Sequence, residues 1–90
     1  MPANEERIDR ILERVRAIPK GSVRTYGDID PKAPRLVGRV LATHPARVPW
    51  HRVVRSDGSV PKGARQLDLL RREGVPILGD RVDMAKARRP

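Results

Sequence analysis

Cysteine and phenylalanine are both absent from this 90-residue chain. Without cysteine the chain can form no disulfide, offer no thiol nucleophile and build no cysteine-ligated zinc or iron–sulfur site. Its two histidines, His44 and His51, are seven positions apart. We therefore expect neither a metal site nor a bound cofactor.

Long apolar runs are missing as well. The longest uncharged apolar run is only a few residues, too short for a membrane-spanning helix. Residues 1–6 lack the basic and apolar regions of a signal peptide. We therefore expect a cytoplasmic protein without membrane association, and the length suits one small monomeric domain.

The excess of positive charge is concentrated in the middle of the chain. The formal net charge is +9, and residues 1–30 add nothing to it because six basic side chains balance six acidic ones. Residues 31–65 carry eight basic side chains against one acidic, and residues 66–90 carry six against four. This pattern predicts a surface that binds a polyanion, with a generic cationic surface as the alternative. Membrane-surface binding is disfavoured, because no long amphipathic segment joins these cations to large apolar side chains.

The first thirty residues are predicted to begin with an amphipathic helix over residues 4–18. Asn4 can cap this helix and Pro19 stops it. The apolar residues at helical spacing are Ile8, Ile11, Leu12, Val15 and Ile18. Residues 22–24 are expected to be extended.

Two short helices joined by a turn follow. Thr25 can cap a brief helix over residues 26–30, and Pro34 suits the first turn of a helix over residues 34–43. The second helix is predicted to have a core side, formed by Leu36, Val37, Val40 and Leu41. Its exposed side is formed by Arg35, Gly38, Arg39 and Ala42. Small residues beside two arginines let a helix approach a charged partner closely. This favours a DNA-binding helix-turn-helix, although an ordinary pair of packed helices shows the same pattern.

A small hairpin is predicted after this helix pair. Residues 52–55 are typical of a strand, and residues 56–59 contain the Asp-Gly signature of a tight turn. Val60 can begin a short return strand, which would make a wing beside the helices.

The C-terminal third is predicted to hold one more helix, over residues 65–73, ended by Gly74. From Asp80 onward the chain is rich in charge. We therefore expect one domain over residues 1–79 and a mobile tail over residues 80–90.

Several segments, in this order, resemble the DNA-binding domain of the O6-alkylguanine-DNA alkyltransferases. They are Ile18-Pro19-Lys20-Gly21-Ser22-Val23, Thr25-Tyr26-Gly27-Asp28-Ile29, Arg35-Leu36-Val37-Gly38-Arg39-Val40-Leu41, Pro49-Trp50-His51-Arg52-Val53-Val54, Ser56-Asp57-Gly58 and Leu70-Arg71-Arg72-Glu73-Gly74. Together they cover roughly residues 5–79, and the combination of Tyr-Gly, Arg-x-Val-Gly and Pro-x-His-Arg-Val is specific as a set. The resemblance implies a mainly helical, winged helix-turn-helix DNA-binding domain with a small β-hairpin.

The residue at the reactive position of that family differs here. The x of Pro-x-His-Arg is the alkyl-accepting cysteine in the repair enzymes, and it is Trp50 in this chain. The change resembles the alkyltransferase-like proteins, which bind O6-alkylguanine without catalysis and direct it to nucleotide excision repair. An indole nitrogen donates hydrogen bonds but is no useful nucleophile, so we expect a protein that is not an enzyme and has no catalytic residue.

The resemblance implies a set of DNA-binding residues, namely Tyr26, Arg35, Gly38 and Arg39. Tyr26 would help to rotate the target nucleotide out of the duplex, or else serve as a core ring with a locally bonded hydroxyl. Arg35 would enter the minor groove and replace the extruded base in the stack, which suits its planar guanidinium. The alternative for Arg35 is a phosphate contact.

The resemblance also implies a lesion pocket, lined by Tyr26, Pro49, Trp50, His51, Val53, Lys62 and Arg65. Lys62 or Arg65 could place a cation over the flipped guanine, although both could equally be ordinary solvated cations. His51 and Glu73 match a pair that activates the thiol in the enzymes, and here we expect a structural hydrogen-bonded pair. Gln66 stands where the active enzymes tend to carry lysine.

Two departures from the family concern the recognition helix. The segment between Tyr26 and Arg35 is several residues shorter than is usual in the enzymes, which implies a tighter elbow. His44 stands where the family favours asparagine before a proline. Both departures bear on where Arg35 reaches.

The expected function is recognition of O6-alkylguanine in double-stranded DNA by minor-groove docking and nucleotide flipping. The expected partners are such DNA and, by resemblance, nucleotide excision repair proteins of the UvrA type, in a nucleoid-associated cytoplasmic location. The alternative is a lesion-independent winged-helix DNA-binding or regulatory protein that uses the same basic face. A hydrolase or transferase built on His51 and Glu73 would lack a nucleophile.

Overall fold

The first helix begins earlier than the sequence predicts. The computed structural model describes residues 2–88, with side chains from residue 5 onward, and α1 spans Pro2–Arg16. Asn4 therefore lies inside α1 and is not its cap; proline is compatible with a first helical turn, so the helix can start at Pro2. The chain leaves the helix through Ile18, whose amide donates to the carbonyl of Val15 at 3.1 Å while its side chain stays buried.

The predicted helix-turn-helix is present. After the two-residue strand β1 (Arg24–Thr25), α2 (Tyr26–Ile29) begins with a reciprocal cap: the Asp28 amide donates to the Thr25 hydroxyl at 3.0 Å, and the Thr25 amide donates to the Asp28 carboxylate at 2.9 Å. The recognition helix α3 spans Pro34–Thr43, as the sequence predicts.

The short elbow between α2 and α3 is organised by Asp30. Its side chain accepts the Lys32 amide at 3.1 Å, and its carbonyl accepts the Ala33 amide at 3.1 Å. The Arg7 guanidinium holds the same carboxylate with two hydrogen bonds of 2.8 and 2.9 Å. The few residues of the elbow are thus fastened to α1, which sets the direction in which α3 starts.

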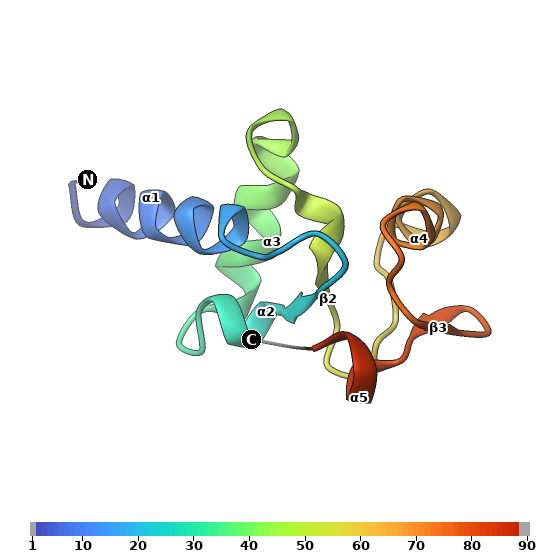
Figure 1. The fold of residues 1–90 in the computed structure, drawn as a ribbon. Helices are drawn as coiled ribbons and strands as arrows, with labels where there is room; N and C mark the ends of the chain where they lie inside the picture. Colours follow the sequence, from blue (N-terminus) through green and yellow to red (C-terminus); the bar gives the residue numbers. More distant parts are fainter. Residues whose placement is uncertain (1, 89–90) are drawn as a thin grey trace.

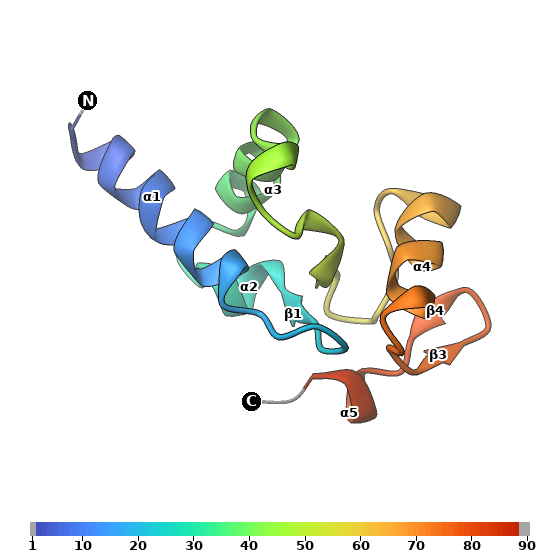
Figure 2. The same cartoon turned by 45° about the horizontal axis from the view of Figure 1, so that its top comes forward.

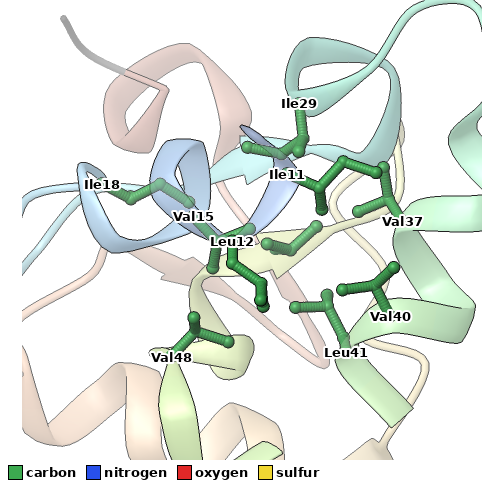
Figure 3. Close-up of a cluster of buried hydrophobic side chains, with 10 residues drawn as sticks. Ile11, Leu12, Val15, Ile18, Ile29, Val37, Val40, Leu41 and Val48 are labelled. Atoms are coloured by element: carbon green, nitrogen blue, oxygen red, sulfur yellow. The ribbon is translucent and has the colours of Figure 1, made fainter. Parts of the chain in front are cut away.

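The hydrophobic core of the N-terminal half joins α1, α2 and α3. Figure 3 shows the side chains of α1 pointing toward those of α3, with Ile29 and Val48 at the margins. The buried members are Ile11, Leu12, Val15, Ile18, Ile29, Val37, Val40, Leu41, Val48 and Val53. Of the four predicted core residues on α3, Leu36 is only partly buried.

A second, smaller core lies in the C-terminal half, under α4 (Gly63–Arg72). Its buried residues are Val23, Val54, Leu70, Val75, Val82 and Ala87. Figures 1 and 2 show the two halves side by side, α1 to α3 in one and α4 to α5 (Met84–Ala87) in the other, in a molecule of 42 × 22 × 19 Å. Strand β2 (Val53–Val54) links the two halves, because it pairs in parallel with β1. Arg24 lies opposite Val53, and Thr25 lies opposite Val54.

The predicted hairpin around residues 56–59 is wrong in its position. The tight turn forms, with the Gly58 amide donating to the Arg55 carbonyl at 2.8 Å, but no return strand begins at Val60. The small antiparallel hairpin is instead β3 (Ile77–Leu78) paired with β4 (Arg81–Val82). The turn is held by this later segment, since the Val82 amide donates to the Gly58 carbonyl at 2.9 Å.

The prediction of a mobile tail is corrected for residues 80–88. Val82 and Ala87 are 2% and 1% exposed, in β4 and in α5 (Met84–Ala87). The Val23 amide donates to the Ala87 carbonyl at 3.0 Å, and the Arg88 guanidinium pairs with the Asp28 carboxylate. Burial of these two apolar residues holds the segment on the body; residues 89–90 of the expected tail lie outside the described residues.

Candidate nucleic-acid interface

The outward face of α3 carries the residues expected to contact DNA. Arg35 and Arg39 are exposed, and neither has a side-chain hydrogen bond or ion pair to another residue in the part of the chain that the structure describes. Gly38 lies between them, and a Cβ built on it would stand 3.8 Å from Cε1 of the Tyr26 ring. The ring of Tyr26 therefore packs close to the middle of α3, between α2 and the basic face.

The hydroxyl of Tyr26 is kept in its neutral form. Burial raises the pKa of the phenol above its ordinary value, and the positive charge of Arg55 opposes part of this rise. Tyr26 also packs against the core of the N-terminal half, so the sequence alternative of a core ring is partly realised. A half-buried neutral phenol can still offer its O–H to a backbone phosphate.

A pocket of about 410 Å³ lies beside this face, between α3, α4 and the two short 3₁₀ turns η1 (Pro45–Arg47) and η2 (Trp50–Arg52). Its lining residues are Tyr26, Gly38, Leu41, Ala42, Pro45, Trp50, Lys62, Arg65 and Gln66. This size falls within the range of small-molecule sites, about 300–1,000 Å³. The pocket can therefore receive a single flat heterocycle.

The structure brings together only part of the predicted pocket. Tyr26, Trp50, Lys62 and Arg65 line it, whereas Pro49, His51 and Val53 do not. Val53 is fully buried because it belongs to the core and to strand β2. The lining residues that the sequence reasoning did not assign to the pocket are Gly38, Leu41, Ala42, Pro45 and Gln66.

Trp50 and Arg65 together form one wall of the pocket. The guanidinium carbon of Arg65 lies 5.9 Å from the centroid of the indole ring, a cation–π distance. Arg65 comes from the first turn of α4 and Trp50 from η2, so the wall spans the two halves of the molecule. A planar aromatic guest would meet an indole surface with a cation beside it.

The expected pair of His51 and Glu73 is present, and it includes a third member. His51 Nε2 lies 2.9 Å from Glu73 Oε1, and the Arg52 guanidinium holds the same carboxylate with bonds of 3.0 and 2.7 Å. Arg52 also donates to the carbonyl of Ile18 at 2.9 Å. The hydrogen bond from Arg52 is the main reason why the pKa of Glu73 lies below its ordinary value. The carboxylate is therefore charged and committed to holding η2.

Gln66 braces the Trp50 segment from the opposite side. It is 1% exposed, and its amide nitrogen donates to the carbonyls of His51 at 3.0 Å and Val53 at 2.8 Å. Its side-chain oxygen accepts the Lys62 amide at 3.1 Å. The sequence signal for this role is the position of Gln66, a polar residue on the buried side of α4.

His44 ends α3 through its main chain. Its amide donates to the Val40 carbonyl at 2.9 Å, and its carbonyl accepts the Arg47 amide at 3.2 Å. In residues 2–88 no side chain hydrogen-bonds to its imidazole. The chain thus turns toward η1 without a hydrogen bond from the His44 side chain within the described residues.

The described residues offer no arrangement suited to a metal ion or to a membrane span. No group of three or more histidine, aspartate or glutamate side chains within residues 2–88 is arranged to hold a metal ion. None of the helices in that part of the chain combines the length and apolar character needed to cross a membrane.

Comparison with known proteins gives consistent matches. The family model described as the 6-O-methylguanine DNA methyltransferase, DNA binding domain, matches residues 6–75. The DNA base-flipping protein of Escherichia coli is 40% identical over 91 residues, which cover 88% of this chain and 70% of that protein. Alkyltransferase-like protein 1 of Schizosaccharomyces pombe is 38% identical over 86 residues, covering 81% of this chain and 80% of the relative.

The fold matches a solved protein–DNA complex. The crystal structure of S. pombe Atl1 with damaged DNA containing O6-carboxymethylguanine superposes with a TM-score of 0.82 at 31% identity, over 96% of each chain. A second structure of the S. pombe protein with DNA gives a TM-score of 0.83 at 34% identity. The helix-turn-helix, the Trp50 pocket and these matches agree: the chain belongs to the family of the 6-O-methylguanine DNA methyltransferase DNA-binding domain and is similar within it to the base-flipping and alkyltransferase-like proteins.

Proposed function

We propose that this protein is a non-catalytic sensor of O6-alkylguanine in duplex DNA, which flips the damaged nucleotide and directs the lesion to nucleotide excision repair. The observation that carries the proposal is the pocket beside the basic face of α3, which Trp50 lines in a chain without cysteine. The names of the relatives support it, since one is called a base-flipping protein and another was crystallised with O6-carboxymethylguanine DNA.

Docking would use the outward face of α3 in the minor groove. Arg35 and Arg39 project from this face, with Gly38 between them to allow close approach of the helix. Turning a nucleotide out of the stack costs a few kcal/mol. Arg35 would offset part of this cost by stacking in the vacated position, and Tyr26 would guide the phosphate of the moving nucleotide.

The flipped base would enter the pocket of Trp50. Its ring would lie against the indole, while Arg65 or Lys62 would bring a cation to its face, a contribution of about 0.5–2 kcal/mol depending on desolvation. The apolar side chains of Leu41 and Pro45 on the pocket lining would accommodate the alkyl group.

No alkyl transfer would follow. The chain has no thiol, and the Glu73 carboxylate is bound by Arg52 and His51. A group that already accepts three hydrogen bonds is a poor candidate for general-base work on a substrate. Recognition without turnover leaves the lesion in place for repair proteins.

The proposal is tested with matched duplexes that carry guanine or O6-methylguanine at one position. We expect tighter binding of the lesion duplex, and we expect Trp50→Ala to reduce that preference while leaving affinity for the guanine duplex unchanged. Leu78→Ala, which alters an exposed side chain on the distant β3, is the control. Equal affinity of the wild-type protein for both duplexes would support the lesion-independent DNA-binding alternative.

The coupling to excision repair is tested separately. A purified UvrA-type protein should bind the lesion duplex more tightly when the sensor is present than when it is absent. The same measurement on the guanine duplex is the control, and an absence of any gain on the lesion duplex would remove this part of the proposal.

A further inference from the structure

A second basic cavity lies away from the Trp50 pocket, between α1 and the α2–α3 elbow. Its volume is about 350 Å³, and its lining is Arg7, Arg10, Ile11, Arg14, Asp30, Pro31 and Lys32. The three arginines stand at positions i, i+3 and i+7 of α1 and so share one helix face. The two cavities have no lining residue in common. We call this one the α1 cleft.

Part of the α1 cleft has a structural explanation. Arg7 is paired with Asp30, which is 7% exposed and organises the elbow. Arg14 donates from Nη1 to the carbonyl of Ile29 at 2.6 Å, which anchors the end of α2. These contacts explain the positions of Arg7 and Arg14. The pairing with Arg7 also neutralises the charge of the Asp30 carboxylate.

The remaining cations of the α1 cleft have no ion-pair partner among the described residues. The side chains of Arg10 and Lys32 have no ion pair or hydrogen bond within the described residues. Arg14 donates one hydrogen bond to a carbonyl, which carries no charge. Four cations therefore face one carboxylate that is already paired. Such a concave cationic site favours an anion with several negative charges.

The position of the α1 cleft points to the anion. Lys32 precedes Arg35 by three residues, so the two Cα atoms are at most about 11 Å apart. Successive phosphates of one DNA strand are about 3.4 Å apart along the helix axis. A duplex held by Arg35 would therefore carry several phosphates within reach of the cleft.

We propose that the α1 cleft binds the sugar–phosphate backbone of the same duplex, outside the groove contacts of α3. This proposal rests on the DNA-binding function proposed above. An acidic protein segment fits less well, because protein interfaces depend on aromatic or apolar anchors in pockets, and the large apolar residue of the cleft, Ile11, is 1% exposed. The cleft offers charge without such an anchor.

The test is the salt dependence of DNA binding by the double variant Arg10→Gln with Lys32→Gln. Each lost phosphate contact lowers the slope of log K against log salt by about 0.9. The contribution of one contact to affinity therefore changes about three- to fourfold when the salt concentration changes fourfold. We expect a smaller slope for the double variant on both guanine and O6-methylguanine duplexes, with the ratio between them unchanged. The matched control removes the same charges elsewhere, with Lys20→Gln and Arg71→Gln, two exposed cations outside both cavities.

The outcomes separate this proposal from the proposed function. A slope equal to that of the control variant would overturn the α1 cleft as a phosphate site. So would unchanged DNA binding together with lost binding of a poly-glutamate peptide, which would make the cleft a protein-docking site. A wild-type protein without lesion preference would overturn damage sensing, while a reduced slope in the double variant would still support the cleft. Because the side chains of Arg10 and Lys32 make no hydrogen bond or ion pair among the described residues, thermal unfolding should be unchanged and serves as the check on folding.

Discussion

Arg35 stands in the first turn of α3 with its side chain exposed and no partner among the described residues. We expect Arg35→Ala to weaken binding of the O6-methylguanine duplex by about 10- to 100-fold, the range of a central interface residue. Arg35→Lys should recover only part of this loss, because lysine keeps the charge but has no stacking plane. Fluorescence anisotropy titrations measure both. Wild-type affinity in the lysine variant would reduce Arg35 to a phosphate contact.

A substitution at Trp50 tests whether this protein differs from the enzymes only in lacking a nucleophile. We expect that Trp50→Cys does not restore alkyl transfer. Cysteine is far smaller than tryptophan, so the variant leaves a void beside the base and holds the sulfur too far from the alkyl carbon. A displacement of 1 Å can already cost about a hundredfold in rate. The structure adds that Glu73 is committed to Arg52 as well as to His51.

Mass spectrometry of the Trp50→Cys protein after incubation with O6-methylguanine duplex provides the measurement. Transfer of a methyl group would add about 14 Da at the new thiol. Trp50→Ser is the matched control, since it opens the same space without a thiol. Stoichiometric methylation within minutes would contradict the prediction and show that the pocket keeps the geometry that the enzymes need.

Glu73 is a residue whose contribution should depend on pH. Glu73→Gln removes the charge that Arg52 and His51 share, and we expect it to lower the free energy of unfolding at pH 7 by about 1–3 kcal/mol. The pKa of Glu73 is depressed in the folded state, so the unfolded chain binds more protons between the two pKa values and stability rises with pH there. The contribution is present above the ordinary pKa of about 4.3 and is lost as the pH falls below it.

Urea unfolding of wild type and Glu73→Gln between pH 7 and pH 3 checks this. The difference between the two proteins should shrink as the pH falls. A difference that stays constant to pH 3 would mean that the carboxylate acts through packing and not through its charge. Asp68→Asn, on an exposed carboxylate of α4, is the control.

At the scale of elements, the turn at residues 55–59 depends on the later hairpin. Gly58 has φ of +86°, and a Cβ there would lie 2.3 Å from the carbonyl oxygen of Val82. Gly63 has φ of +65° with nothing within 4 Å of its Cβ position. We expect Gly63→Ala to cost about 1–2 kcal/mol from backbone conformation alone. Gly58→Ala should cost about 1–3 kcal/mol more, because the backbone of β4 must also shift.

Denaturant unfolding of the two glycine variants measures this difference directly. Equal losses would show that β4 yields to the new methyl group and that its contact with the turn contributes little. A larger loss at Gly58 would show that the β3–β4 hairpin and the turn stabilise each other, as the bond from the Val82 amide to the Gly58 carbonyl implies.

At the scale of the whole molecule, we expect the net charge of +9 to set the strength of DNA binding and the pocket to set its selectivity. We expect the slope of log K against log salt to be the same for guanine and O6-methylguanine duplexes, at about 0.9 per neutralised phosphate. The ratio of the two affinities should then stay constant from low to high salt. A ratio that falls toward one with rising salt would mean that the preference is electrostatic and not a property of the pocket.

The whole fold also shows which expectations rested on local signals. The bounds of α3 were predicted because Pro34 and the His44-Pro45 pair act on the chain within one turn. The capping of α2 by Thr25 was predicted because its hydroxyl acts on an amide only three positions away, and the reciprocal bond from Asp28 is added by the structure. The resemblance led to the pairing of His51 with Glu73, but it did not assign Arg52 to the same carboxylate.

The sequence by itself determined the amphipathic helices, the turn chemistry, the basic middle segment and the absence of a thiol, because each depends on residue type or on neighbours a few positions away. The tertiary structure decided the parallel pairing of β1 with β2, the place of the hairpin, the packing of residues 80–88 and the burial of Gln66. These features join segments that are far apart in the chain, and their stability comes from apolar burial and shared hydrogen bonds that exist only once both segments are in place. A two-residue strand or a single buried glutamine has too little local signal to show in the sequence, and its conformation follows from the surface against which it packs.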